Sequence, residues 1–598
     1  MDSRIQHLIG LLQAGRPGDA EVACRALLAS RPADPVAWNL LGIALRQLTR
    51  LDEAEAAMRR AVGISGSNPE FRTNLAQFLG ARGRLDDGIA EFHRAIAAAA
   101  NFRPARLGLA RVANQAGQPA LAEEQARALI AADANDNEAW SALGTALHAQ
   151  GLLAEATAAM QRAVTTQPNY PAARLNLAIV LAEQERAEDA LEQVEAAARL
   201  GIAERRLGLT RARAQMQLDR YDAAEAQLEE LVASNPDDIE CQFMLAQLRH
   251  VRGDADFARS LRAAAARPGS PAATRAQYAD VLRRSGQAVA AEGLIRELIR
   301  SEGPRPQLTS SLATILLESG RAPEAIVAAQ AGADAVPDDV TIAENLVAAL
   351  LVDCRPDRAL PIIDRFHRMF RNDQRWITYR ADAGRQRGED LFAEWCDLER
   401  LVRVYQLEPP PGYGSIEEFH AELKPVLESR HRQATHPLDQ SLRGGTQTSR
   451  GLLADPHPLI RTYLSLLATP LAEYQAAIGR DPAHPLLSRN AGTARPTGCW
   501  SVRLKRGGFH VNHIHPQGWI SSAYYVSVPA EVEDTTVRSG WIKFGEPLFP
   551  TPACAAGRMI QPKPGRLVLF PSYLWHGTNP ILGDEPRLTI AFDSLPTP

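Results

Sequence analysis

The chain has 598 residues, of which 45% are apolar and 23% are charged, and this length exceeds that of one ordinary globular domain. The formal net charge of −4 argues against binding of nucleic acid, because phosphate backbones require concentrated Lys and Arg. No apolar run of about eighteen residues and no secretory signal pattern is present. The six cysteines are scattered, which is typical of reduced thiols. We therefore expect a cytoplasmic protein that binds neither nucleic acid nor membranes.

The first two thirds of the chain repeat. Trp38 and the pair Leu41–Gly42 recur as Trp140 and Leu143–Gly144, at an offset of 102 residues, which is three periods of 34. Each period predicts two short amphipathic helices whose crossing points carry small residues. One such pair cannot bury its apolar face alone, so neighbouring pairs are expected to stack into a solenoid.

The W-x-x-L-G opening, the alanine in the middle of each unit and the closing proline resemble the tetratricopeptide repeat. The resemblance extends over residues 1–406 in about eleven or twelve copies. It implies an all-α solenoid whose concave face binds a protein or peptide.

The chain changes character at "LEPPPGYGS" (407–415), whose prolines and glycines predict a linker. Residues 416–598 are then expected to form a second domain. It begins with two predicted helices, "IEEFHAELKPVLES" and "PLIRTYLSLLATPLAEYQAAIG". From residue 498 the apolar period shifts towards two in short runs such as "WISSAYYVSV", "RLVLFP" and "RLTIAF". Strands at this spacing predict a small antiparallel barrel or jelly roll.

Histidines are concentrated in "FHVNHIHPQGW". His513 and His515 have the same parity, so on a strand they point into one cavity, whereas His510 has the opposite parity and is interpreted as a core residue. A third candidate ligand, His576, ends an apolar run in "LFPSYLWHGTNP".

The order H-x-H, "PKPGRLVLFPSYLWHGTNP" and "PRLTIAF" resembles the iron(II)- and 2-oxoglutarate-dependent oxygenases, which have a double-stranded β-helix (jelly-roll or cupin-like) fold. The resemblance includes a bacterial subgroup in which this domain follows tetratricopeptide repeats. The resemblance implies that His513, His515 and His576 bind the metal. It also implies that Arg587 pairs with the distal carboxylate of 2-oxoglutarate, with the Thr589 hydroxyl two places on. The implied cofactors are Fe(II) and 2-oxoglutarate.

One position departs from the usual pattern. Most of these enzymes hold iron with two histidines and one carboxylate, but His515 stands at the carboxylate position, and residues 482–530 contain no Asp or Glu. Either three histidines bind the metal, or His515 lies behind the ligands and water takes its place. Both alternatives stay open at this point.

The sequence therefore predicts a dioxygenase that hydroxylates a protein or peptide recruited by the repeats, with no catalytic residue beyond the metal ligands. Two alternatives are a zinc-dependent hydrolase or lyase that uses the same three histidines, and a non-catalytic adaptor with an inert oxygenase-like domain. The substrate, the hydroxylated residue and the oligomeric state do not follow from the sequence, nor does the choice between recruitment and assembly as the role of the repeats.

Overall fold

The computed structural model describes residues 2–202 and 205–597. Contacts divide the chain into two compact units, Met1–Ala214 and Gln215–Pro598, and each unit is described by itself. No helix in these two described ranges is both long and apolar enough to span a membrane.

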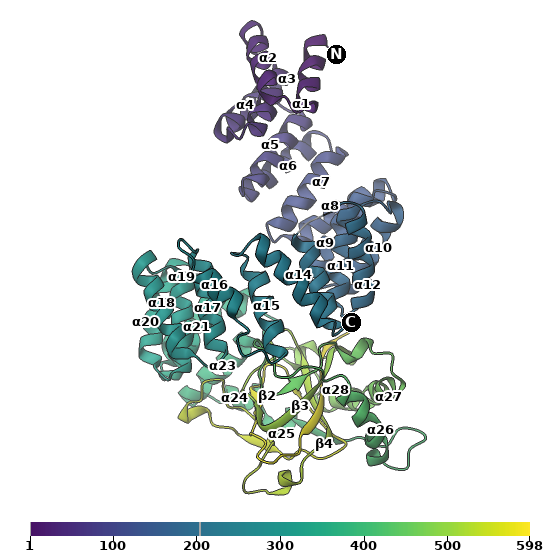
Figure 1. Cartoon of the computed structure of the whole chain (residues 1–598), viewed down its shortest axis with the longest axis vertical. Helices are drawn as coiled ribbons and strands as arrows, with labels where there is room; N and C mark the ends of the chain where they lie inside the picture. The colour runs from purple at the N-terminus through teal and green to yellow at the C-terminus, as the bar shows by residue number, and fades with distance from the viewer. Residues whose placement is uncertain (1, 203–204, 598) are drawn as a thin grey trace. The chain divides into compact units, whose positions relative to one another are not determined.

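The first unit consists of paired antiparallel helices (Figure 1). Its helices are α1 (Ser3–Gln13), α2 (Pro17–Ser30), α3 (Pro35–Gln47), α4 (Leu51–Ser65), α5 (Pro69–Ala81), α6 (Leu85–Ala98), α7 (Arg103–Gln115), α8 (Pro119–Ala132), α9 (Asn137–Ala149), α10 (Leu153–Thr166), α11 (Pro171–Glu183), α12 (Ala187–Arg199) and α13 (Arg205–Gln217), the last of which runs across the boundary between the units.

The repeat motif has a direct packing explanation. A Cβ atom on Gly42 would lie 2.6 Å from Met58 Cγ, and one on Gly144 would lie 2.4 Å from Met160 Cγ. Both distances are shorter than carbon–carbon contact permits. The glycine therefore lets the second helix of each of these pairs lie close against the first.

Helix starts repeat in the same way. Asp34 accepts hydrogen bonds from the backbone N–H groups of Val36 and Ala37, and Asp136 accepts one from Ala139. Such capping satisfies donors that have no partner inside the helix. The 34-residue period therefore includes helix-capping residues as well as packing residues.

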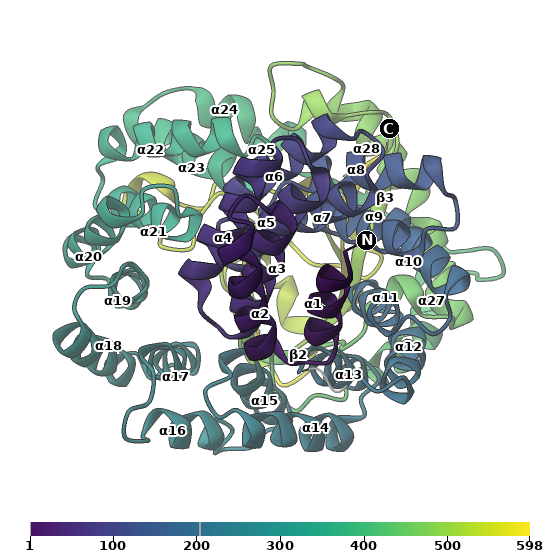
Figure 2. The same ribbon diagram turned by 90° about the horizontal axis from the view of Figure 1, so that it is seen from above.

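The second unit continues the helical pairs. Its repeat helices are α14 (Tyr221–Ser234), α15 (Ile239–Val251), α16 (Arg259–Ala265), α17 (Ala272–Arg284), α18 (Ala288–Glu302), α19 (Pro306–Glu318), α20 (Ala322–Ala335), α21 (Val340–Val352), α22 (Pro356–Met369) and α23 (Gln374–Arg387). Figure 2 shows α16 to α23 following one another as successive helices. Helix α16 is the shortest of these, with seven residues.

The same unit contains the C-terminal sheets. Further helices are α24 (Leu391–Trp395), α25 (Leu398–Leu401), α26 (Ile416–Glu428), α27 (Pro458–Leu466) and α28 (Ala468–Ile478). The strands are β1 (Arg403–Gln406), β2 (Leu442–Gln447), β3 (Ala494–His510), β4 (Ile520–Ser527), β5 (Ile542–Phe544), β6 (Arg558–Ile560), β7 (Arg566–Pro571), β8 (His576–Thr578) and β9 (Arg587–Pro596). One sheet has the order β1-β7-β4-β9-β3-β2 and the other has the order β6-β5-β8, and all pairs are antiparallel. The predicted solenoid followed by a jelly-roll type of sheet domain is confirmed.

Two details differ from the sequence expectation. Residues 403–406, predicted as the end of the solenoid, form β1 and pair with β7. The second predicted helix after the linker is broken into α27 and α28 at Leu467, because Pro470 in the first turn of α28 has no N–H to donate to a preceding carbonyl.

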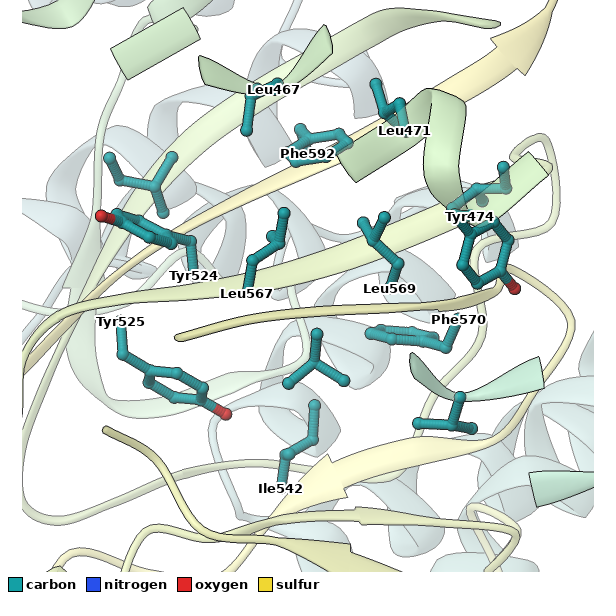
Figure 3. Close-up of a cluster of buried hydrophobic side chains, with 14 of the residues drawn as sticks. Leu467, Leu471, Tyr474, Tyr524, Tyr525, Ile542, Leu567, Leu569, Phe570 and Phe592 are labelled. Carbon is teal, nitrogen blue, oxygen red and sulfur yellow. The ribbon is translucent and has the colours of Figure 1, made fainter. Parts of the chain in front are cut away.

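The core of the sheet domain lies on both faces of β7 (Figure 3). Leu567 and Leu569 face Leu471, which belongs to α28, while Phe570 lies on the opposite face toward Ile542 of β5. The alternation follows from the two-residue period of a strand. Strand β7 is therefore buried on both faces, which explains the unbroken apolar run in its sequence.

Helix α23 joins the last repeat to the sheet domain within this unit. The backbone N–H of Gln374 donates to the Pro516 carbonyl at 3.2 Å, and the Thr378 hydroxyl donates to the Tyr573 carbonyl. These contacts place a repeat helix directly against the segments that carry the predicted histidines.

Candidate metal centre

Backbone pairing brings the predicted histidines together. His513 and His576 form an isolated antiparallel bridge, with N–H to carbonyl distances of 2.9 and 3.0 Å in the two directions. The His515 N–H donates to the Ser572 carbonyl at 2.9 Å. His513 and His515 thus lie just beyond the end of β3 rather than within a regular strand, and His576 opens β8.

The three side chains converge. One ligand atom from each of His513, His515 and His576 lies within 4.8 Å of the others. The ring of His513 is 4.2 Å from that of His576 and 5.2 Å from that of His515, measured between centroids. A metal ion binds imidazole nitrogen at about 2.0–2.1 Å, so the cluster is compact enough to bind one ion.

The hydrogen bonds of two histidines define which nitrogen faces a metal. His513 Nδ1 lies 2.9 Å from the Val511 carbonyl, and His576 Nδ1 lies 3.0 Å from the Leu574 carbonyl. A carbonyl can only accept, so each Nδ1 carries the proton and each Nε2 keeps its lone pair. Nε2 is therefore the nitrogen available to a metal.

His515 is oriented by a carboxylate instead. Its Nδ1 lies 2.6 Å from Asp593 Oδ2, and Asp593 Oδ1 accepts a hydrogen bond from Ser521 Oγ at 2.7 Å. Ser521 Oγ is also 2.8 Å from Ser572 Oγ. A carboxylate behind a metal-binding histidine fixes the ring and raises its basicity. Because Nδ1 is held by Asp593, Nε2 is the nitrogen of His515 that faces the other two histidines.

Sequence reasoning missed Asp593. A signal was present: Arg587, Thr589 and Asp593 have the same parity on β9, so all three point to the face that lines the cavity. Asp593 lies 78 residues from His515, so no local sequence pattern connects the two.

Burial and charge set the protonation of the cluster. Burial, with a further contribution from His515, lowers the pKa of His513 to about 3. Burial, followed by the neighbouring histidines, holds the pKa of His576 well below its usual value. Burial also disfavours the charged form of His515, but the charge and hydrogen bond of Asp593 outweigh it and raise the pKa of His515. Neutral imidazole is the form that binds metals.

His510 lies outside the group of three. Its Nδ1 is 3.0 Å from Ser441 Oγ, and its ring lies 5.8 Å from that of His513. Ser441 Oγ is also 3.3 Å from His513 Nε2. The serine, which precedes β2, is thus the hydroxyl next to a metal-facing nitrogen, and sequence reasoning did not single it out.

A cavity of about 1060 Å³ opens over the histidines. Arg587 lines it and is 2% exposed, and its Nη1 donates to the Gly540 carbonyl. Arg587 Nε and Tyr525 Oη are buried polar atoms with no hydrogen-bond partner among the described residues, and the guanidinium lies 5.6 Å from the Tyr525 ring centroid. Burial lowers the pKa of Arg587. Unpaired buried donors cost free energy, so this corner fits an anionic ligand.

Thr589 lies in the same wall, but its hydroxyl donates to the Val502 carbonyl at 3.3 Å. That hydrogen bond leaves the oxygen lone pairs of Thr589 to face a ligand. The structure therefore places Arg587 and Thr589 together, as their spacing on a strand predicts.

The repeats form the opposite wall of this cavity. Residues from the first helices of successive pairs line it: His250 of α15, Arg283 and Arg284 of α17, Glu318 of α19, Glu344 of α21, and Arg375 and Tyr379 of α23. The cavity is therefore bounded by the sheet domain on one side and by repeat helices on the other.

Family models match both parts of the chain. Residues 498–593 match the family described as "Putative 2OG-Fe(II) oxygenase". Tetratricopeptide-repeat models match residues 7–69, 107–171, 141–204 and 277–340, and a second repeat model matches residues 205–248. The matched oxygenase segment contains His513, His515, His576, Arg587 and Asp593.

Solved structures resemble the repeats at low identity. YrrB, described as a tetratricopeptide-repeat protein with an unusual peptide-binding site, is 20% identical, with a TM-score of 0.26 and coverage of 31% of this chain and 95% of YrrB. Yeast Tom70 is 13% identical, with a TM-score of 0.40 and coverage of 66% of this chain and 98% of Tom70. No similar sequence was found among curated proteins.

Proposed function

We propose that this chain, which carries tetratricopeptide repeats followed by a domain of the 2OG-Fe(II) oxygenase family, is an iron(II)- and 2-oxoglutarate-dependent dioxygenase that hydroxylates a protein or peptide. One observation carries the proposal: three histidines whose ligand atoms lie within 4.8 Å of one another share a cavity with the buried guanidinium of Arg587, which has an unpaired Nε. His513, His515 and His576 would hold the iron, and Arg587 with Tyr525 would hold a carboxylate of 2-oxoglutarate.

When bound, iron and 2-oxoglutarate would supply the oxidative chemistry with O₂ as the oxidant: one oxygen atom would enter succinate as 2-oxoglutarate loses CO₂, and the other would hydroxylate a substrate C–H bond. The residues of the chain fit this pair of groups. Imidazole is a suitable ligand for iron, and a guanidinium binds a carboxylate through two parallel hydrogen bonds.

The protein contributes orientation and exclusion of water. Asp593 holds the proton of His515 on Nδ1 and brings a negative charge to the position where most such sites have a carboxylate ligand. The Trp500 ring stacks on the His515 ring, with centroids 6.0 Å apart and planes at 15°. Phe570 packs against His576, with ring centroids 4.6 Å apart. Trp500 thus covers one face of His515, and Phe570 lies against His576.

The cavity itself favours an oxygenase over a zinc hydrolase. Three histidines are also the ligand set with which zinc activates water, so the ligands alone do not distinguish the two. Arg587 does, because a water-activating zinc site has no need of a buried cation with unpaired donors beside it. The same unpaired donors argue against an inert domain.

The wall of repeat helices supports a polypeptide substrate. Tetratricopeptide repeats bind peptides or proteins, and stacked repeats present extended concave surfaces. Here the first helices of five successive pairs line the cavity that contains the histidines. A peptide held by these helices could place a side chain at the metal.

The test uses the full chain, prepared without metal and reconstituted with Fe(II) in the absence of oxygen. We expect one metal ion per chain and formation of succinate from 2-oxoglutarate once oxygen is admitted. His513→Ala and His576→Ala should lose both properties, whereas His510→Ala should keep the metal. Wild-type iron affinity in the first two variants would refute the ligand assignment. Zinc binding without succinate formation under any condition would favour the hydrolase.

A further inference from the structure

One cation in the cavity, Arg443, forms no ion pair with the described residues; burial lowers its pKa, and the charge of the nearby Glu318 carboxylate opposes this shift. Arg443, the second residue of β2, is half-buried, and its Nη1 donates to the carbonyls of Gln440 and Leu442 at 2.6 and 2.7 Å. No carboxylate of the described residues forms an ion pair with it, and its Nε and Nη2 make no hydrogen bond to them. That edge of a guanidinium is the one that binds a carboxylate bidentately.

Two histidine side chains lie near Arg443. His250 and His436 line the same part of the cavity, with ring centroids 5.5 Å apart. Burial, followed by the charge of Arg443, lowers the pKa of His436 to about 4, so this imidazole is neutral near pH 7. Imidazole is either neutral or positively charged, so neither histidine offsets the positive charge of Arg443.

Two arginines of α17 lie nearby and differ in their partners. Arg283 is fully engaged, since it bonds Glu318 and also Asp280 at 2.7 Å. Arg284 donates through Nε to Asp280 at 2.6 Å, and its Nη1 and Nη2 make no hydrogen bond to described residues. Two guanidinium groups, Arg443 from the sheet domain and Arg284 from a repeat, thus present free donors to one cavity.

This charged corner adjoins the metal centre. Ser441, two residues before Arg443, lies 3.3 Å from His513 Nε2, and Leu442 is paired with His510 in the sheet. An extended peptide advances about 3.3 Å per residue. A side chain that reaches the metal and a second side chain that reaches Arg443 can therefore belong to neighbouring residues of one peptide.

From these contacts we infer that Arg443 and Arg284 form a subsite for an acidic side chain of the polypeptide substrate, next to the residue that is hydroxylated. The inference rests on the proposed function and adds a substrate class to it: peptides with Asp or Glu close to the target. Arg587 is separate, because it lies on β9 with its own buried donors.

The experiment measures peptide binding, which does not depend on turnover. The probes are two pools of short peptides with randomised flanks, one with Glu and the other with Gln fixed at the centre, and a third pool with phosphoserine there. The full chain is loaded with Mn(II) and 2-oxoglutarate without oxygen. We expect the Glu pool to bind about 10-fold more tightly than the Gln pool, a preference that weakens with added salt.

Arg443→Gln and Arg284→Gln should each bring the two pools close to equal affinity, while Arg506→Gln should keep the preference. Arg506 is an exposed arginine of β3 that pairs with Asp584, so it controls for loss of one positive charge. If Arg443→Gln disturbs folding, Arg284→Gln still tests the subsite from the other wall.

Three results would overturn the inference: equal binding of the Glu and Gln pools by the wild type, a preference that survives both arginine variants, or retention of the phosphoserine pool alone. A raised KM for 2-oxoglutarate in Arg443→Gln would assign this arginine to the cosubstrate instead. Metal binding and succinate formation without peptide test the proposed function separately, so the two can fail independently.

Discussion

Replacing Asp593 by Asn tests whether the carboxylate behind His515 controls the metal centre. Both oxygens of Asp593 accept hydrogen bonds, Oδ2 from His515 Nδ1 at 2.6 Å and Oδ1 from Ser521 Oγ at 2.7 Å. Asn has the same shape but only one acceptor atom. Its NH₂ group must therefore face either the serine or the histidine. In the second orientation the imidazole proton moves to Nε2, where it blocks a metal.

The expected effect is a loss in metal affinity. Mutation of the residue that hydrogen-bonds a metal-binding histidine from behind lowers metal affinity by about 10–100-fold. This corresponds to about 1.4–2.7 kcal/mol of binding free energy. We expect the upper part of this range, because the bond is short and charged and the Asp593 side chain is 19% exposed. The assay is competition for Mn(II) between the apoprotein and a chelator. Asp584→Asn, at an exposed carboxylate that pairs with Arg506, is the matched control.

Thermal unfolding of the apoprotein separates metal binding from folding. We expect Asp593→Asn to keep a Tm close to that of wild type while its metal affinity falls. Wild-type metal affinity in this variant would show that Asp593 does not orient a metal ligand. His515 would then no longer be assigned as a ligand.

Three further predictions address the cosubstrate, the buried acid of α23 and the folding unit. Arg587→Gln should raise the KM for 2-oxoglutarate with little change in metal affinity, since truncating a buried charge pair costs about 2–5 kcal/mol, and Arg587→Lys should lie between; unchanged KM in both would make this arginine structural. Burial raises the pKa of Asp382 to about 7, while its Oδ2 accepts a hydrogen bond from Trp575 Nε1 at 2.8 Å. Because the folded state then holds a proton that the unfolded state releases, the stabilisation is complete below pH 4 and falls by about 4 kcal/mol as the pH rises to 7. Urea unfolding at about pH 5 and pH 8 should show about 3 kcal/mol of this loss in wild type and a smaller change in Asp382→Asn, and the same change in both proteins would contradict the prediction. A fragment of residues 215–598 should fold and bind metal, whereas 408–598 should aggregate because it lacks β1 and α23; size-exclusion chromatography and metal titration of both fragments decide this.

The solenoid was predictable because its signals are local. Gly42 and Gly144 recur at the same place in their repeats, and each lies against a methionine of the following helix. Contacts inside one repeat involve residues less than one period apart, so a single sequence displays them as a pattern. The point where the compact units divide has no such signal, since it falls inside α13 and depends on which helices pack together.

The longer strands of the sheet domain were predictable from the sequence, but the short edge strand β1 was not. Alternation in "WISSAYYVSV" and the apolar run "RLVLFP" indicate β4 and β7 directly. β1 is different, because four residues, "RVYQ", become a strand through pairing with β7 more than 150 residues later. Trp575 and Asp382 also meet across this distance. Local propensity holds no information on such contacts.

In the candidate site too, residues linked by a local sequence pattern could be predicted, whereas a residue brought in by long-range pairing could not. His513, His515 and His576 could be grouped from parity and motif order, and Arg587 and Thr589 from their spacing on one strand. Asp593 could not be assigned, because it lies 78 residues from His515 and reaches it only where β9 pairs with β4 and the β4 flank carries the histidine segment. An imidazole in place of a carboxylate ligand lacks negative charge of its own. On the proposed ligand set, Asp593 supplies negative charge one hydrogen bond behind the His515 ring, so the histidine segment and the charge that would compensate for it come from distant parts of the same sheet domain.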